Sequence, residues 1–515
     1  MILAASASDA GAVDDQSRGA GQRKGRSSLL LGGSLLVTSV LGAAQAFALL
    51  VVCGTDPRIE AFLAAHALYL PVAIMGSSLR ATVSGLVSRA PVGERGMYGS
   101  EVASRCILLG ALVAGAMLVL TPLLASAISG DLPSSVRETT LVALALLLPA
   151  AFLHVVAAAL SGALGAHDQF GFSAMAYVVT GTIALGVSIG MLSAIGPLGA
   201  GAGLLAGTAL LAGAHMRRAH TCGIRVRLTR NALRERTQWQ VAAHVLSGAA
   251  LGFALLANLA ISLAVLDVQA GAITAYSYAF FMSTMILSVS SLPLGLVTLP
   301  GLVGSVQRHG RPAVADHFVR FAPYAYAVVL PLVAGFLGFG SAIVAWTFEP
   351  FVGLAVAQLV FEVGGALVLM TIPATLFYLA SVASLPAATP RERLFAAGVT
   401  VALHGLAVSV VSGEPHAVAS AHAVAMLLST IFLLAQILRR QVFIAVILAL
   451  RGVVPVAIAS APVLLIGLVV GSSTAMATIA GAAVLAVMVY LLVLHRLAPA
   501  VAAPFVALLR RTATT

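Results

Sequence analysis

The sequence has little charge. Only 9% of its 515 residues are charged, whereas 60% are apolar, and the mean hydropathy is +1.06. Soluble domains are about a quarter charged, so the composition excludes a soluble globular protein. A hydrocarbon core about 30 Å thick takes about 20 helical residues per crossing, so the chain has room for a dozen or more spans. We predict a polytopic membrane protein.

Cysteine and strand patterning are scarce as well. The three cysteines, Cys53, Cys106 and Cys222, are scattered and odd in number, so the sequence indicates neither a disulfide framework nor a zinc site. Membrane barrels need strands of alternating polarity, whereas residues 475–494 form one long apolar run. The membrane-crossing elements are therefore predicted to be helices.

Signatures of catalysis are missing too. The sequence holds no Walker A glycine loop, no His-Glu-x-x-His pair and no nucleophile elbow. The predicted external loops are also too short to form a catalytic domain. We therefore predict a protein that is not an enzyme and that has no catalytic residue, metal site or cofactor.

Apolar runs broken by charges, turns and Pro/Gly clusters predict an all-α protein with about fourteen transmembrane helices. An even number of spans places both termini on the same side of the membrane. The spans are expected near 28–53, 60–88, 106–128, 139–165, 172–195, 198–216, 240–265, 270–306, 321–346, 353–383, 394–412, 416–438, 452–470 and 472–495.

Basic residues give the orientation, because lysine and arginine stay in cytoplasmic loops. With cytoplasmic termini, 25 of the 28 basic residues fall in cytoplasmic segments. Only Arg58 and Arg137 lie outside, and Arg80 is left within a span. This topology explains the net charge of +11 without nucleic-acid binding. The basic loop at 217–239 is expected to be a topological anchor that joins two lobes, and contact with anionic lipid headgroups is the alternative.

The same loop divides the chain into two halves with equal numbers of helices, as in duplicated transporters whose substrate sits between two lobes. We expect two pseudo-symmetric six-helix bundles followed by two extra helices. The expected units are a disordered cytoplasmic tail (1–27), an N-terminal lobe (28–216), the basic loop (217–239), a C-terminal lobe (240–438), and the two extra helices with a cytoplasmic tail (439–515).

Three stretches resemble the MurJ/MviN lipid II flippase family of the MOP exporter superfamily. The first is Gly271-Ala-Ile-Thr-Ala-Tyr-Ser-Tyr-Ala279, followed by Leu-Pro-Leu-Gly at 292–295 and Thr-Leu-Pro at 298–300. The others are Ile-Glu-Ala-Phe-Leu-Ala-Ala at 59–65 and Gly-Ala-Leu-Gly-Ala-His-Asp-Gln-Phe at 162–170. The resemblance implies a V-shaped pair of bundles that moves a polyprenyl-linked sugar precursor outward by alternating access.

The chain also departs from that family, which lines its cavity with arginines on helices 1, 2 and 8. Here helix 1 carries Gln45, helix 8 carries Phe280 and Phe281, and Arg80 alone stands on helix 2. The usual aspartate at the start of helix 2 is Glu60. The expected cargo is therefore the broader class of lipid-linked or amphipathic molecules.

Arg80 is the first candidate for substrate binding. It lies nine residues before Arg89, roughly 13 Å into the membrane, where an arginine costs about 2.5–3.5 kcal/mol. Its guanidinium suits a phosphate, and the alternative is an internal ion pair or snorkelling toward the surface. The other predicted substrate-binding residues are Gln45, Glu60, Ser84, Tyr276 and Tyr278.

A coupling cation or proton is expected to use polar residues inside the spans. Glu362 is the other deeply placed charge, and Asn258 and His404 lie on helices 7 and 11, where the related family binds sodium. No carboxylate accompanies them there. Each histidine within a span could relay protons, although a neighbouring carbonyl more often satisfies such a ring. These histidines are His66, His154, His244, His404 and His422.

The sequence thus predicts a flippase or exporter for a lipid-linked glycan precursor in the bacterial cytoplasmic membrane. A MATE-like drug/cation antiporter is the first alternative. A membrane scaffold that does not transport is the second, and an integral-membrane transferase is disfavoured by the short loops.

Overall fold

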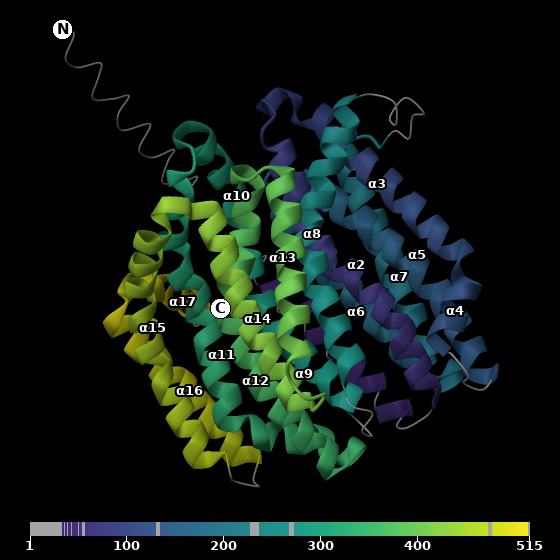
Figure 1. Cartoon of the computed structure of the whole chain (residues 1–515), viewed down its shortest axis with the longest axis vertical. Coiled ribbons are helices and arrows are strands. Elements are labelled where there is room, and N and C mark those ends of the chain that lie inside the picture. The colour runs from purple at the N-terminus through teal and green to yellow at the C-terminus, as the bar shows by residue number, and fades with distance from the viewer. Residues whose placement is uncertain are drawn as a thin grey trace.

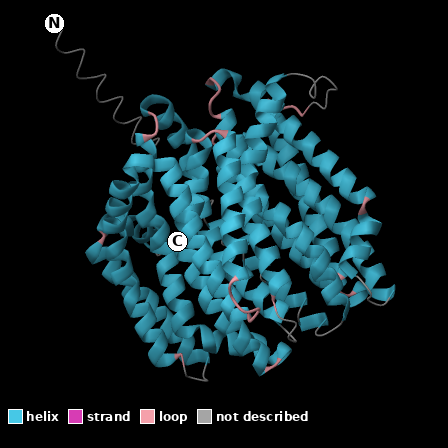
Figure 2. Cartoon of the chain, in the orientation of Figure 1, coloured by secondary structure: helices cyan, strands magenta, loops and turns pink. Residues whose placement is uncertain are grey.

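The computed structural model describes residues 57–129, 134–226, 236–266, 272–471 and 476–512, together with short stretches between 33 and 53. Every regular element of this part of the chain is helical (Figure 2). Ten of its helical segments are long and apolar enough to cross a membrane. The prediction of an all-α membrane protein is confirmed, and the count of fourteen spans stays a prediction.

The helices are described in three groups that follow chain order. The first group is α2 (Pro57–Val87), α3 (Arg95–Val119), α4 (Thr121–Ser129), α5 (Ser134–Gly165), α6 (Phe170–Ile195) and α7 (Leu198–Thr221). The second group is α8 (Arg236–Val265), α9 (Ala272–Val289), α10 (Ser291–His309), α11 (Pro312–Val352), α12 (Leu354–Ala387), α13 (Pro390–Ser409) and α14 (Pro415–Leu438). The third is α15 (Val442–Val470), α16 (Met476–Leu497) and α17 (Pro499–Thr512).

We call these sets the N-terminal group, the C-terminal group and the appended helices. In the N-terminal group, α5 packs on α2, α3 and α7, and α6 packs on α7. In the C-terminal group, α12 packs on α9, α11 and α14, and α13 packs on α8. Figure 1 shows the two groups side by side, with α15 and α16 at the outer edge of the second against α11.

Helix α2 makes much of the contact between the two groups, since it packs against α8, α10 and α12. Small side chains allow this approach. A Cβ on Gly248 of α8 would meet the Thr82 side chain, and a Cβ on Gly85 would lie 3.6 Å from Leu299. Ala81 joins Leu296 and Leu299 in a small apolar cluster at the same junction. One face of α2 therefore belongs to the junction between groups.

Two predicted helix starts lie too late in the sequence. The helix expected at 106–128 begins at Arg95 and is broken at Leu120 into α3 and α4. Arg105, predicted for a loop, is thus buried within α3 and pairs with Glu101 one turn earlier. The helix expected at 452–470 begins at Val442, so Arg451 also lies inside a helix. A charged residue ends an apolar run in the sequence, whereas the helix continues through it by pairing or exposing the charge.

Other boundaries differ as well. The basic loop predicted at 217–239 is shorter, because α7 continues to Thr221 and α8 begins at Arg236, with residues 227–235 outside the described part. The span expected at 270–306 is two helices that meet at Ser290. The C-terminal tail contains a further helix, α17, which packs on α16 and α11. The predicted tail at 1–27 and much of the first span lie outside the described residues.

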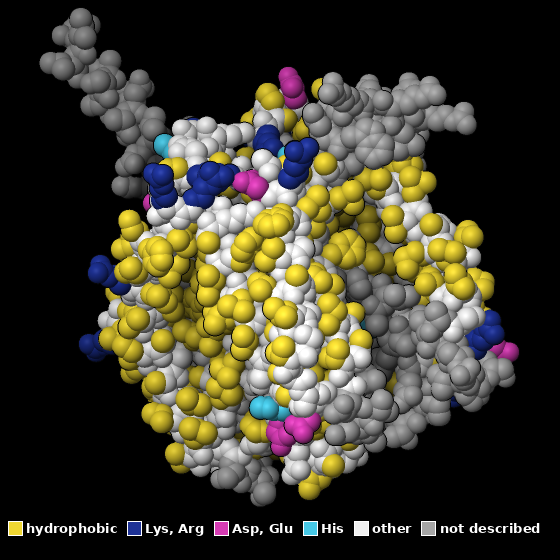
Figure 3. Space-filling model, in the orientation of Figure 1, with side chains coloured by type: hydrophobic (Ala, Val, Ile, Leu, Met, Phe, Trp, Pro, Cys, Tyr) yellow, Lys and Arg dark blue, Asp and Glu magenta, His cyan; other side chains and the backbone are white. Residues whose placement is uncertain are grey.

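The surface has the pattern of a membrane protein. Figure 3 shows apolar side chains covering the middle of the molecule, whereas most of the visible lysine and arginine side chains gather at one end. Large apolar side chains such as Val119, Phe443 and Val469 are exposed on the outer helices. We call the end that carries these basic side chains the basic end.

Candidate functional site

Arg80 is buried inside the N-terminal group. Its side chain is only 6% exposed, and its guanidinium carbon lies 4.5 Å from the ring centre of Tyr177 on α6. Its backbone packs against Gly162 of α5, where a Cβ would approach the Arg80 carbonyl oxygen to 2.6 Å. Gly162 therefore permits the close approach of α5 that encloses Arg80. The guanidinium gains an attraction to the ring face, which is strongest where water is excluded.

Several polar atoms of this group have no hydrogen-bond partner among the described residues. They include Nε and Nη1 of Arg80, the Tyr177 hydroxyl and the hydroxyls of Ser84 and Ser161. No carboxylate in the described part of the chain forms an ion pair with Arg80. Each unpaired buried polar group costs about 1–3 kcal/mol, and more when it is charged. The guanidinium is thus suited to an anion or to ordered water.

A row of aromatic and imidazole rings extends from Arg80 through the N-terminal group. Successive ring centres are 5.5 to 6.4 Å apart. Within it, His215 is fully buried, with Nδ1 2.9 Å from the Leu211 carbonyl and Nε2 3.3 Å from the Ser173 hydroxyl. The rings in order are Phe62, His66, Tyr69, His154, Tyr177, His215 and Phe172.

The other residues predicted for substrate binding lie in different places. Ser84 is one turn from Arg80 and is buried beside Gly165. Gln45 donates hydrogen bonds to the Ser188 hydroxyl (2.9 Å) and the Ala200 carbonyl (3.1 Å), so it ties the first helical segment to α6 and α7. The Glu60 side chain is outside the described residues. The structure therefore brings together only Arg80 and Ser84 of this set.

The two predicted tyrosines face different neighbours. The Tyr278 ring contacts Phe348 at 5.2 Å, at the end of the molecule opposite the basic end. Tyr276 is completely buried, and its hydroxyl lies 3.0 Å from Nδ1 of His422 on α14. Tyr276 thus belongs to a second polar cluster, inside the C-terminal group, rather than to the surroundings of Arg80.

That second cluster includes two of the residues predicted for ion coupling. His404 and Asn258 are both fully buried there, and His422 joins them. Glu362, the third, is instead exposed on α12 and forms no ion pair with a described residue. Glu362 lies eight residues inside α12, and its role in ion coupling stays a prediction.

At the basic end, two arginines donate hydrogen bonds to backbone carbonyls at the end of α12. Arg89, just beyond α2, donates to the Leu385 carbonyl of α12 (3.0 Å). Arg393 is 1% exposed and donates to the carbonyls of Ser384, Leu385 and Ala388 and to the Ser247 hydroxyl at 2.8–3.3 Å. These carbonyls lie at the end of α12, where positive charge is favourable.

The chain was then compared with known proteins. It matches no protein-family model and no curated protein sequence. It is similar to a solved structure of the lipid II flippase MurJ in an inward closed conformation, with a TM-score of 0.68 and 12% identity over 91% of this chain and 98% of that one. The fold is MurJ/MATE-like.

Two further structures share this MurJ/MATE-like fold. One is an outward-facing multidrug resistance transporter of the MATE family, with a TM-score of 0.66 and 12% identity over 82% of this chain and 96% of that one. The other is a MOP superfamily transporter from Pyrococcus furiosus, with a TM-score of 0.65 and 12% identity over 83% and 95% of the two chains. The fold expected from the sequence resemblance is thereby confirmed.

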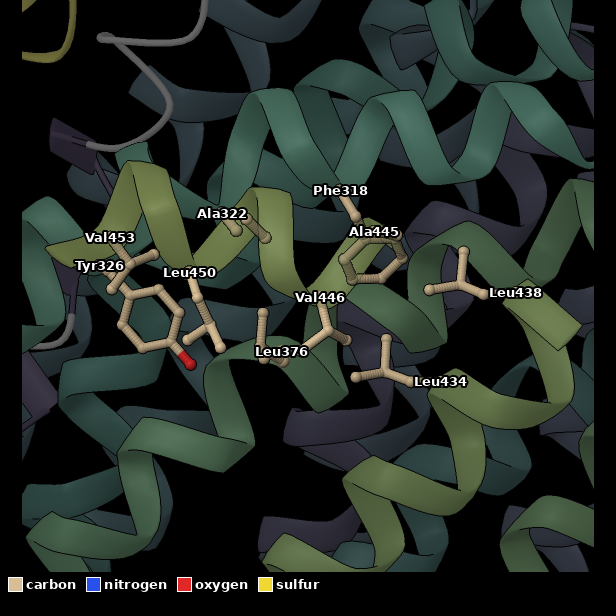
Figure 4. A pocket seen from close by; sticks show the side chains of 11 residues that line it. Phe318, Ala322, Tyr326, Leu376, Leu434, Leu438, Ala445, Val446, Leu450 and Val453 are labelled. Carbon is tan, nitrogen blue, oxygen red and sulfur yellow. The ribbon is translucent and has the colours of Figure 1, made fainter. Parts of the chain in front are cut away.

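The appended helices leave a small apolar gap within this fold. A cavity of about 30 Å³ lies between α11, α12, α14 and α15 (Figure 4). Tyr326 provides the polar side-chain group of its lining, and its hydroxyl donates to the Ile372 carbonyl (2.8 Å). The cavity is too small for more than a water-sized group, so it is not a candidate substrate site.

Sequence reasoning missed several members of these sites. Tyr177 and His215 lie on other helices than Arg80, and no spacing in the sequence links them. Arg393 was counted with the cytoplasmic loops, because a basic residue at a helix start usually stays in water. One signal could have identified it: Thr389 and Glu392 form the spacing of a capping box, which places Arg393 in the first turn of α13.

Proposed function

We propose that the chain is a flippase or exporter that moves a lipid-linked glycan precursor, or a similar amphiphile, across the membrane by alternating access. The observation that carries the proposal is the buried Arg80 guanidinium without an acidic partner among the described residues. A MurJ/MATE-like fold supplies the context, since its members in solved structures include a lipid II flippase and a multidrug resistance transporter.

The chemistry of Arg80 favours an anionic headgroup. A guanidinium offers two parallel N–H donors to phosphate oxygens, and each charge-assisted bond is worth about 1.5–3 kcal/mol. Burial raises the strength of such a bond, because little water competes for the donors. A phosphate or pyrophosphate linked to a polyprenyl chain would use both the cation and the apolar surroundings.

Alternating access would use the two groups of helices as lobes. We infer that residues 28–216 and 240–438 form the two lobes, with residues 439–515 appended to the second. The junction of α2 with α8, α10 and α12 at the basic end would then be the closed face of one state. The similar structures include inward closed and outward-facing conformations, which supports this cycle.

We further infer a bacterial cytoplasmic membrane with both termini in the cytoplasm. The basic end would then face the cytoplasm, as the positive-inside rule requires. Transport would be coupled to a cation or proton, and the chain would catalyse no covalent change.

The MATE-like drug/cation antiporter is the second candidate function. The fold favours it equally, because a MATE transporter matches this chain about as well as MurJ does. A buried arginine, however, repels cationic drugs and attracts anions. The identity of residue 80 thus separates the two candidates by the charge of the cargo.

Purified protein in liposomes that contain a fluorescent polyprenyl pyrophosphate tests the proposal. We expect Arg80→Gln to slow flipping about 10- to 100-fold, the equivalent of one charge-assisted contact, and Arg80→Lys to retain part of the rate. Arg391→Gln removes an exposed arginine of α13 and serves as the matched control. An unchanged rate in a folded Arg80→Gln protein would refute the role of Arg80.

A further inference from the structure

The C-terminal group encloses a polar cluster contributed by four helices. His404 on α13 and His422 on α14 are 0% and 1% exposed, and their ring centres are 4.3 Å apart. Ser262 and Asn258 from α8 and Tyr276 from α9 complete the cluster, and all three are fully buried. Five polar side chains gathered at one place in the interior require an explanation, because burying them without hydrogen bonds is costly.

The hydrogen bonds of the cluster meet at one hydroxyl. Ser262 Oγ lies 2.9 Å from Nε2 of His404 and 3.4 Å from Nδ1 of His422. The Tyr276 hydroxyl lies 3.0 Å from the same Nδ1 of His422. The single Ser262 proton can therefore be donated to one ring or to the other, according to which ring nitrogen is already protonated.

This geometry has room for one added proton. When His404 is neutral, its Nε2 accepts the Ser262 hydroxyl proton. When a proton is added at Nε2, that nitrogen donates to Ser262 Oγ, and the hydroxyl rotates toward Nδ1 of His422, whose single lone pair accepts either this proton or that of the Tyr276 hydroxyl. Nδ1 of His404 lies near the backbone carbonyl of Asn258, which is placed to accept its proton.

Unsatisfied atoms in the same cluster also point to a bound cation. Both polar atoms of the Asn258 side chain, and Nδ1 of His404, have no hydrogen-bond partner of normal geometry within the described ranges. Asn258 and Ser262 are one turn apart on α8, so both face the histidines. The amide oxygen of Asn258 is thus available to stabilise positive charge in this cluster.

The surroundings of the pair select a proton rather than a metal ion. No described carboxylate contacts either ring, and no group of three or more His, Cys, Asp or Glu side chains that could hold a metal is found in the described part. The Phe280 ring centre is 5.8 Å from that of His422, and the buried Thr400 lies one turn before His404 on α13, with its hydroxyl donating to the Ala396 carbonyl. Two charged imidazoles at 4.3 Å would repel each other, so the pair holds one proton.

On α13 and α14, the nearest charged residues lie farther along the helices. Arg393 is 11 residues before His404 on α13, and the exposed Glu414 is 8 residues before His422, or about 16 and 12 Å along the axes. Asp267, beyond the end of α8, lies outside the described residues. The pair itself is about 8–10 Å inside the end of the molecule opposite the basic end, counted from Ser409 and Pro415.

We propose that His404 and His422 form a proton-binding site that holds one proton, exchanged through Ser262, and that this proton is the cation coupled to transport. The coupling rests on the proposed function, whereas proton binding does not. Entry from the side opposite the basic end would let an inward proton gradient load the site.

Proton uptake by the full-length protein in detergent between pH 8.5 and 5 tests the binding directly, without any cargo. We expect the double variant His404→Gln/His422→Gln to take up one proton fewer than the unsubstituted protein. The matched control His309→Gln/His416→Gln removes two exposed imidazoles that lie outside the cluster, on α10 and α14. A loss of two protons in the His404/His422 variant would overturn the shared proton, and no loss would overturn the site.

Ser262→Ala provides a second variant that keeps both rings. It removes the hydroxyl that accepts the His404 proton, so the one-proton uptake should shift to lower pH. An unchanged midpoint of uptake would overturn the role of Ser262. Because these titrations contain no cargo, they are independent of the Arg80 flipping assay, and the failure of either proposal can be told from the failure of the other.

Discussion

At the residue scale, Arg393 is expected to contribute strongly to the free energy of unfolding. Five hydrogen bonds link its guanidinium to Ser247 and to the last carbonyls of α12. Arg393→Met removes five charge-assisted hydrogen bonds from a buried place, so we expect the free energy of unfolding to fall by about 2–4 kcal/mol. Thermal unfolding in detergent measures this change. Arg391→Met, two residues earlier and exposed, should differ little from the unsubstituted protein.

Glu392 should give stability its dependence on acid pH. Hydrogen bonds from the Thr389 backbone, and then the Arg311 guanidinium, lower the pKa of this carboxyl below its usual value of 4.5. A lowered pKa in the folded state contributes stability above pH 4.5, and this stability is lost as the pH falls through the folded-state value.

We therefore expect the melting temperature to be steady from pH 7 to about 5 and then to decline, with a weaker decline in Glu392→Gln. Melting curves at a series of pH values measure the effect. An equal decline in both proteins would show that other carboxylates cause the loss of stability at acid pH.

Individual site residues were only partly predictable. The charge of Arg80 within an apolar run identified it, because such a residue is rarely kept without a role. The ring beneath it did not stand out, since Tyr177 is one of many aromatic residues on apolar helices. His404 was identified by its helix, but its pairing with His422 depends on the crossing of α13 and α14, which no short motif encodes.

At the element scale, α11 and α15 touch through glycine. A Cβ on Gly467 would lie 2.7 Å from the Gly338 Cα, and one on Gly471 would lie 2.3 Å from the Gly338 carbonyl oxygen. Because both obstacles are backbone, a side chain there forces the helices apart. Small residues at such crossings are how membrane helices associate closely.

Gly467→Ala should therefore weaken the docking of α15 by about 1–3 kcal/mol. Hydrogen exchange of α15 amides is expected to increase, while exchange in α2 and α5 stays the same. Gly481→Ala on α16 adds a methyl group where the structure has open space and is the matched control. Equal hydrogen exchange in both variants would mean that α15 shifts to make room for the methyl group without weaker docking on α11.

Elements were the most predictable level. Long apolar runs identified thirteen of the described helices or helix pairs, because a membrane requires about 20 apolar residues per span. Their ends were less predictable: α3 and α15 continue through Arg105 and Arg451, where pairing or exposure makes the charge tolerable. The amphipathic α17 was missed because it is too short and too polar to resemble a span.

At the scale of the whole molecule, the junction between α2 and α8 is expected to open during transport. Cysteines at positions 82 and 248, in a chain without Cys53, Cys106 and Cys222, would be close enough to cross-link, since a Cβ on Gly248 lies 3.1 Å from Cγ2 of Thr82. We expect Thr82→Cys/Gly248→Cys to lose flipping when oxidised and to regain it when reduced.

Each single cysteine variant should be insensitive to oxidant. Gel mobility after cleavage between residues 82 and 248 measures how much of the protein is cross-linked. Normal flipping by fully cross-linked protein would mean that α2 and α8 stay together throughout the cycle.

For the arrangement of the two groups, the sequence offered only two signals, which were the equal numbers of predicted helices and the charged loop between them. The sequence indicated a division near residues 217–239, yet it could not show which face of α2 meets the other group. That depends on small side chains such as Ala81 and Gly85, which are common throughout this chain. Arg80 lies on another face of the same helix, so its environment follows from the packing of α5 and α6.

The position of Arg80 also has an electrical consequence. Its charge sits seven residues from the end of α2, about 10 Å along the axis, and no described anion cancels it. One elementary charge crossing the full membrane voltage is worth about 2.3 kcal/mol per 100 mV. Any displacement of Arg80 along the membrane normal therefore changes the energy of the protein in the field, and in the proposed transport cycle the voltage favours the state in which that arginine is nearest the negative side.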